Sequence, residues 1–87
     1  MEKHWFVYIL QCGDGTLYTG VTDDLAHRLE MHRSGKGAKY TRGRSPLSLV
    51  YHENASSYSE ALKREYAIKQ LTRTEKLKLI DNKPAAE

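Results

Sequence analysis

The chain has 87 residues, of which 39% are hydrophobic and 29% charged, and its formal net charge is +3. Folded domains usually have about 50 to 250 residues, and this composition is too polar for a membrane protein and too apolar for disorder. The longest apolar run, residues 5–10, is far shorter than the roughly 20 residues of a membrane-spanning helix. We therefore expect a single water-soluble domain over residues 1–87, with a core at 5–80 and a flexible C-terminal tail.

The only cysteine, Cys12, cannot form an internal disulfide, and it ends an apolar segment as a buried thiol would. These features favour a location in the reducing environment of the cytoplasm. A single cysteine also excludes the usual thiolate zinc sites. Of the histidines, only His27 and His32 are close in sequence, and they fall on different helix faces. A zinc site is therefore not expected.

Two strands joined by a tight turn are predicted first. Residues 5–12 carry apolar side chains at both parities, as a strand buried on both faces does, and residues 16–21 are the expected partner strand. If the turn at 13–15 is a three-residue loop with its last glycine in the left-handed conformation, Tyr8 and Tyr18 lie on one face. A four-residue loop would put them on opposite faces.

A helix is expected next, because Thr22 or Asp23 can cap a helix that extends to about Arg33. A periodicity of about 100 degrees per residue gathers four side chains on its core-facing side. These are Leu25, Arg28, Leu29 and His32. A guanidinium and an imidazole thus share this stripe. Arg28 alone also fits a surface arginine whose aliphatic portion packs along apolar side chains while its guanidinium is solvated.

A glycine-containing basic loop follows the helix. Between residues 31 and 52 the chain has no acidic residue, and its basic side chains are Arg33, Lys36, Lys39, Arg42 and Arg44. This pattern fits a loop that faces nucleic-acid phosphates, and it fits equally a solvated basic loop without a partner.

The rest of the chain predicts one strand and two helices. A strand over residues 47–53 begins after Pro46. Two capping boxes, each a Ser or Thr followed three residues later by Glu, precede helices at about 59–71 and 72–81, and the tail begins at Asn82. The order β-β-α-β-α-α indicates an α/β (α+β) sandwich with a three-stranded mixed or antiparallel sheet flanked by helices.

The second predicted helix carries an acid on its inward side. The apolar members of that stripe are Ala61, Leu62 and Ile68, and Glu65 falls between them. A buried unpaired carboxylate is costly, so Glu65 should either bind a metal or pair with a cation. Arg28 and Lys69, which lies one turn further along the helix, are both available as structural partners.

Together, Tyr8, Tyr18, Arg28, His32 and Glu65 suit phosphodiester hydrolysis. One carboxylate can hold a single hydrated Mg²⁺ or Mn²⁺ shared with the phosphate, whereas a two-metal site needs more acids. An arginine can neutralise charge growing on the phosphate. A phenol can accept a proton from water if nearby cations lower its pKa, which is normally about 10. Both tyrosines also fit ordinary strand aromatics.

The same residues resemble the motifs of the GIY-YIG nucleases. Phe6-Val7-Tyr8 and Tyr18-Thr19-Gly20 are similar to the Gly-Ile-Tyr and Tyr-Ile-Gly elements that name the family. Arg28 falls at the family's helix arginine, His32 at the His or Tyr one turn later, and Glu65 at the metal-binding glutamate. The resemblance implies the β-β-α-β-α-α fold, a 5′-phosphate and a 3′-hydroxyl as products, and the following roles. Tyr8 is the general base, Tyr18 and His32 position water and phosphate, Arg28 stabilises the transition state, and Glu65 binds the metal.

Residues 34–43 resemble the small stand-alone bacterial subfamily that is related to the excision-repair nuclease domain. Val21 departs from the family pattern, since many relatives have a lysine there, and Asn82 matches the family's C-terminal asparagine only loosely in spacing. Without this lysine, the expected site lacks a basic side chain that many relatives have.

We therefore expect a Mg²⁺- or Mn²⁺-dependent phosphodiesterase that hydrolyses DNA rather than RNA, selects structure rather than sequence, and acts in DNA repair or turnover. No membrane is expected as a partner. A separate protein is a candidate source of DNA specificity. One alternative is a nucleic-acid-binding module with little or no catalysis; another is an accessory subunit that contacts proteins through Trp5, Tyr51 or Tyr58.

Overall fold

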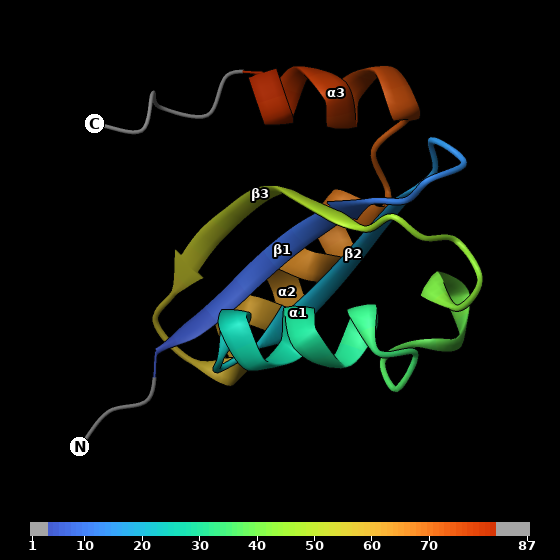
Figure 1. Ribbon diagram of the computed structural model, residues 1–87. Coiled ribbons are helices and arrows are strands. Elements are labelled where there is room, and N and C mark those ends of the chain that lie inside the picture. The colour runs from blue at the N-terminus through green and yellow to red at the C-terminus, as the bar shows by residue number, and fades with distance from the viewer. Residues whose placement is uncertain (1–3, 82–87) are drawn as a thin grey trace.

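The computed structural model describes residues 4–81, so the predicted tail and Asn82 lie outside the described residues. Its elements are β1 (Trp5–Gln11), β2 (Leu17–Thr22), α1 (Leu25–Arg33), the 3-10 turn η1 (Lys39–Thr41), β3 (Ser48–Ala55), α2 (Tyr58–Lys69) and α3 (Arg73–Asp81) (Figure 1). The strands form an antiparallel sheet in the order β2-β1-β3. The predicted element order and fold class are confirmed.

The register of the first hairpin matches the three-residue loop. Leu10 pairs with Tyr18. Gly15 has a φ of 86°, and the Cys12 amide donates to the Thr16 carbonyl at 2.8 Å. Glycine adopts this left-handed conformation without the Cβ clash of other residues. Because paired residues of an antiparallel sheet point to the same side, Tyr8 and Tyr18 share one face.

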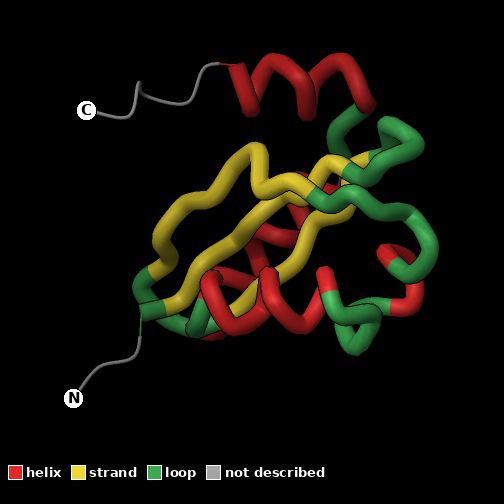
Figure 2. Tube along the Cα trace, viewed as in Figure 1, coloured by secondary structure: helices red, strands yellow, loops and turns green. Residues whose placement is uncertain are grey.

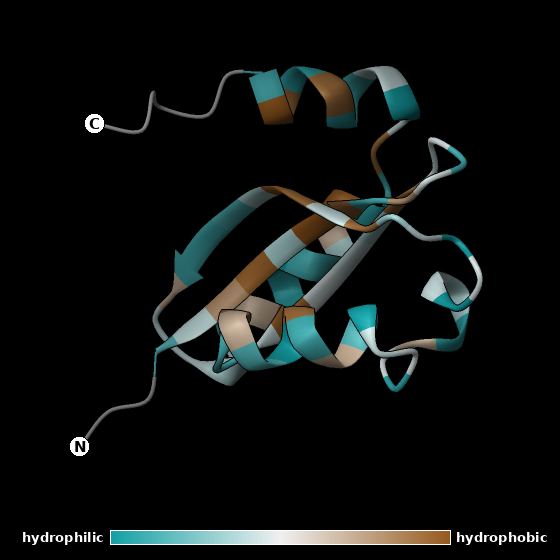
Figure 3. Cartoon of the chain, in the orientation of Figure 1, coloured by the Kyte–Doolittle hydropathy of each residue, from teal (hydrophilic) through white to brown (hydrophobic). Residues whose placement is uncertain are grey.

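Helices cover both faces of the sheet (Figure 1), with α1 in front of the strands and α2 behind them. On the α2 side lies the apolar core, which consists of Val7, Ile9, Tyr51, Ala61 and Ile68. Leu79 and Ile80 of α3 pack against the same core. On the α1 side the sheet presents the alternate residues of β1, Tyr8 and Leu10. The apolar colouring of β1 in Figure 3 fits a strand buried on both faces.

Side-chain caps fix where the helices begin. Asp24, one residue beyond the predicted caps, accepts the His27 amide at 3.0 Å. The capping box at α3 is confirmed, because the Thr72 hydroxyl accepts the Glu75 amide at 3.2 Å and the Glu75 carboxylate accepts the Thr72 amide at 2.8 Å. At α2 one of the two bonds forms: Ser57 accepts the Glu60 amide at 3.1 Å, while the Glu60 carboxylate pairs with Lys63. The prediction that Leu62 faces inward is wrong, because its side chain is 40% exposed.

The segment between α1 and β3 is mostly irregular and runs around one end of the sheet (Figure 2). β3 extends two residues beyond its predicted end, because Ala55 still pairs with Trp5 of β1. Within residues 4–81, no helix has the length and apolar character to cross a membrane.

Candidate active site

The site lies on the α1 side of the sheet, where one arginine joins two phenols. The Arg28 guanidinium lies within interaction range of the hydroxyls of both Tyr8 and Tyr18, whose ring centres are 6.4 Å apart. Tyr8 is only 2% exposed. A small pocket beside them is lined by Tyr8, Leu10, Leu25, Arg28, Leu29 and Leu49. The predicted convergence of β1, β2 and α1 at this face is therefore observed.

His32, from the last turn of α1, completes this cluster. Its Nε2 lies 2.8 Å from the Tyr8 hydroxyl oxygen, and its ring centre is 5.3 Å from that of Tyr18. The side chain is 2% exposed. Its other ring nitrogen, Nδ1, lies 3.0 Å from the Thr41 hydroxyl oxygen. Both nitrogens of a buried imidazole thus have polar partners from different segments.

Two glycines leave room for these rings. A Cβ on Gly20 would lie 2.5 Å from the Tyr8 hydroxyl oxygen and 3.1 Å from a Tyr18 ring carbon. A Cβ on Gly37 would overlap the His32 ring, at 2.8 Å from its Cγ. Real Cβ atoms essentially never approach other atoms this closely. The glycine that ends Tyr18-Thr19-Gly20 is therefore required by the Tyr8 ring packed over it.

Burial and the arginine set the protonation states of the cluster. Burial raises the pKa of Tyr8 above its usual value, although the Arg28 guanidinium opposes this shift. Burial, assisted by the same guanidinium, lowers the pKa of His32 below its usual value. Hydrogen bonding to Tyr8 raises the pKa of Arg28 further. At neutral pH the site therefore holds a neutral phenol, a neutral imidazole and a cation.

Glu65, the predicted metal ligand, belongs to α2, which covers the other face of the sheet. Its side chain is 20% exposed, and one carboxylate oxygen lies 3.3 Å from the Lys69 ammonium nitrogen. Of the two structural partners considered from the sequence, Lys69 is the one that forms the ion pair. The carboxylate also contributes to the raised pKa of Tyr8, which places it within electrostatic range of the phenol.

This acid suits a hydrated divalent ion better than an all-protein metal cage. Among residues 4–81, no three His, Cys, Asp or Glu side chains gather closely enough to hold a metal. Mg²⁺ commonly uses one or two carboxylates and fills its other positions with water and substrate phosphate oxygens. A single partly exposed carboxylate meets that requirement.

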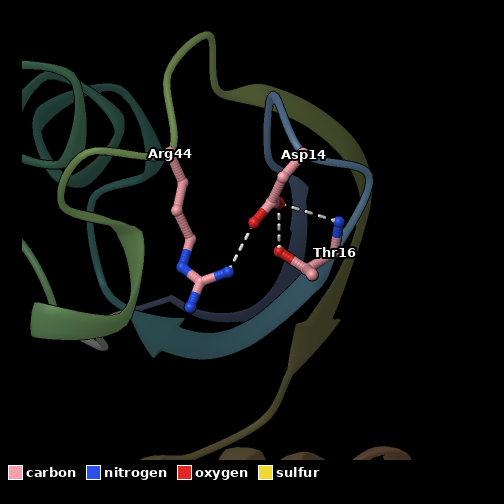
Figure 4. A network of polar contacts seen from close by, with 3 residues as sticks. All are labelled: Asp14, Thr16 and Arg44. Atoms are coloured by element: carbon pink, nitrogen blue, oxygen red, sulfur yellow. Dashed lines mark hydrogen bonds and ion pairs between the residues drawn. The ribbon is translucent and has the colours of Figure 1, made fainter.

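The basic loop is mostly exposed and is tethered at its end. The side chains of Arg33, Lys36, Lys39 and Arg42 are exposed. Arg44 instead forms an ion pair with Asp14 of the hairpin turn at 2.5 Å, and the Thr16 hydroxyl donates to the same carboxylate at 2.7 Å (Figure 4). Hydrogen bonds from Thr16, with Arg44 beside it, lower the pKa of Asp14.

Arg44 also contacts Tyr40, which packs beside Tyr18. The Arg44 guanidinium carbon lies 4.4 Å from the centre of the Tyr40 ring, and that ring lies 5.8 Å from Tyr18. Tyr40 is 43% exposed. The loop is therefore packed onto the tyrosine cluster rather than projecting freely from it.

The sequence indicated the basic residues of the loop but not the residues of the loop that face inward. Thr41 and Gly37 contact the His32 ring, while the lysines beside them face solvent. The only available signal was that uncharged residues, Gly37 and Thr41 among them, are interspersed with the basic residues between positions 35 and 42.

On the α1 side, the sheet thus presents a tyrosine pair to an arginine and a histidine of one helix, and a carboxylate of a second helix lies within electrostatic range of Tyr8. The chain matches the GIY-YIG catalytic domain over residues 4–78 and belongs to that family of nucleases.

The chain is also similar to bacterial proteins of its own size. The chain is 57% identical over 81 residues to a UPF0213 protein of Oceanobacillus iheyensis, covering 93% of this chain and 94% of the relative. A UPF0213 protein of Staphylococcus epidermidis is 58% identical over 80 residues, covering 92% and 96%. The solution NMR structure of a UPF0213 protein from Bacillus halodurans is similar, with a TM-score of 0.61 and 48% identity, covering 94% of this chain and 87% of that one.

Proposed function

We propose that this protein is a divalent-metal-dependent phosphodiesterase that hydrolyses DNA, selects structure over sequence, and acts in cytoplasmic DNA repair or turnover. The observation that carries the proposal is the partly buried Arg28 side chain, which interacts with the hydroxyls of Tyr8 and Tyr18 beside His32. A fixed cation among proton-transfer groups is suited to the negative charge that grows on a phosphate during hydrolysis. The family assignment supports the same chemistry.

Each residue has a role within this proposal. Arg28 faces the non-bridging phosphate oxygens and stabilises their charge in the transition state. Tyr8 takes the proton of the attacking water, and Tyr18 and His32 orient water and phosphate. Glu65 would hold Mg²⁺ or Mn²⁺, which when bound supplies a Lewis acid for the phosphate.

The basic loop is the proposed DNA contact. Arg33, Lys36, Lys39 and Arg42 face solvent near the cluster, and Arg44 lies beside Tyr40. Contacts with phosphates position a nucleic acid but carry no sequence information. A preference for structure over sequence, with further specificity supplied by a protein partner, follows from a contact surface of this kind.

Glu65→Gln tests the proposal. The substitution removes the metal-binding charge while keeping the size of the side chain, so cleavage should fall by at least about 100-fold. The assay uses labelled single-stranded, duplex and branched DNA and RNA with Mg²⁺, Mn²⁺ or EDTA. Glu60→Gln is the matched control, because Glu60 lies on the same helix in an exposed ion pair with Lys63.

Metal-dependent cleavage that is lost only in the Glu65 variant would support the nuclease. Unfolding of that variant would instead identify the Glu65–Lys69 ion pair as structural. One observation favours a second candidate, a nucleic-acid-binding module without catalysis, since Glu65 already has Lys69 as its partner. Salt-sensitive binding without cleavage in both wild type and Glu65→Gln would establish this second function.

A further inference from the structure

The basic loop makes a buried contact with His32 through Thr41. Thr41 is neither one of the charged residues of the loop nor one of the motif residues of the site. Thr41 is 2% exposed, and its hydroxyl lies between two polar groups. It donates to the Ala38 carbonyl at 2.9 Å, and its oxygen lies 3.0 Å from His32 Nδ1. A threonine hydroxyl has only one proton to donate. If that proton goes to Ala38, the hydroxyl oxygen must accept a proton from Nδ1.

The opposite end of the imidazole leads to the same assignment. Tyr8 has two partners, the Arg28 guanidinium and His32 Nε2. A guanidinium donates hydrogen bonds and cannot accept them. Among these contacts, only Nε2 can take the phenolic proton. One arrangement therefore satisfies every contact in the chain: Tyr8 O–H donates to Nε2, Nδ1–H donates to Thr41, and Thr41 O–H donates to Ala38.

We propose that Thr41 is a positioning residue for the nuclease reaction: its hydroxyl holds His32 in the Nδ1–H form, so that Nε2 accepts the phenolic proton of Tyr8. This inference rests on the proposed function, since it assigns a direction to the proton transfer there. It also gives the inward side of the basic loop a role that its charge does not provide. Gly37 supports the same arrangement by letting the loop backbone lie against the imidazole.

The resulting proton path is balanced. Water gives a proton to the Tyr8 oxygen as the phenolic proton passes to Nε2. The hydroxide forms the new bond to phosphorus, the bond between phosphorus and the 3′ oxygen breaks, and that oxygen takes a proton from solvent. His32 then carries one positive charge, with Nδ1–H still bonded to Thr41, until it releases its proton to solvent. Because burial keeps the free phenol protonated, Tyr8 needs such an acceptor.

The test compares Thr41→Val, which keeps the shape and removes the hydroxyl, with Thr41→Ser, which retains it. Long-range proton–nitrogen NMR of the His32 ring identifies which nitrogen carries the proton, independently of activity. Thr19→Val is the matched control, because Thr19 is equally buried at 4% exposure and its hydroxyl has no hydrogen-bond partner among the described residues.

Wild type, Thr41→Ser and Thr19→Val should all show the Nδ1–H form. Thr41→Val should shift the ring toward Nε2–H and lower kcat by about 100-fold with little change in KM, as expected for loss of general-base catalysis. An Nε2–H ring in wild type, or an unchanged ring in Thr41→Val, would overturn the proposal. Even if Thr41→Val fails to fold, the wild-type spectrum decides. A wild type with the expected ring that never cleaves would contradict the nuclease function, and with it the role of Thr41 in a reaction.

Discussion

The two faces of this sheet differ in character, although β1 supplies residues to both: the α2 side is apolar and the α1 side is polar. Val7 and Ile9 of β1 point to the α2 side and are fully buried in an apolar core. Tyr8, between them, points to the α1 side and bonds to Arg28 and His32. Alternation along a single strand thus separates the residues that hold the fold from those that the proposal assigns to chemistry.

The magnitudes of the interactions favour the same division. Full burial of a Val or Ile side chain stabilises a fold by about 1.5–3 kcal/mol. A typical intramolecular hydrogen bond contributes only about 0.5–1.5 kcal/mol net. The apolar face should therefore dominate the free energy of unfolding, whereas substitutions on the polar face that preserve shape should act mainly on cleavage.

The largest expected difference between the faces comes from a pair of arginines. Arg28→Lys keeps the charge but loses the planar fork that spans Tyr8 and Tyr18, so single-turnover cleavage should fall by about 100-fold or more. Arg64→Lys alters the exposed ion pair with Glu53 on the α2 side, where Nε lies 2.5 Å from the carboxylate. Its cleavage rate should match wild type. Equal losses in the two variants would contradict a separation of the faces.

A smaller effect should appear in the pH dependence of stability. His32 faces Tyr8 from β1, Tyr18 from β2, Arg28 from its own helix and Thr41 from the loop. Burial lowers its pKa below the unfolded value of about 6.5. The unfolded chain therefore binds the proton first as the pH falls, and this contribution to stability, present above pH 6.5, is lost as the pH drops through the native pKa.

Urea unfolding between pH 7.5 and 5.5 measures this effect. Below pH 6.5 wild type should lose up to about 1.4 kcal/mol of stability for each pH unit, until the pH reaches the native pKa. The His32→Asn variant should lose less stability than wild type over this pH range. The matched control His27→Asn, on the exposed side of α1, should lose as much stability as wild type. A steeper loss in His32→Asn than in wild type would contradict a neutral, buried imidazole.

The sequence was most informative where a single local rule decides the geometry. The turn with Gly15 in the left-handed conformation set the hairpin register, and the register placed Tyr8 and Tyr18 together. Helical periodicity put Arg28 and His32 on the same side of α1, as observed. The capping boxes located the starts of α2 and α3 within a residue or two.

Features that depend on contacts distant in sequence could not be predicted this way. Thr41 contacts His32 across an irregular loop, where no periodicity indicates which side chains turn inward. Leu62 is exposed because α2 presents only a narrow stripe to a three-stranded sheet, and Ala61 and Ile68 fill it. Tyr51 was considered as a surface anchor, but it is 7% exposed and its hydroxyl donates to Glu53, so it cannot serve as one.

The most direct test of the central claim compares two tyrosines on opposite faces of the sheet. Tyr8 and Tyr51 are both buried and both use their hydroxyls in hydrogen bonds. Single-turnover cleavage by Tyr8→Phe should be at least about 100-fold slower than wild type. Tyr51→Phe should cleave at the wild-type rate and lose only about 1 kcal/mol of stability. Cleavage that is unaffected in Tyr8→Phe, or equally impaired in both variants, would contradict the assignment of the α1 face as the active site.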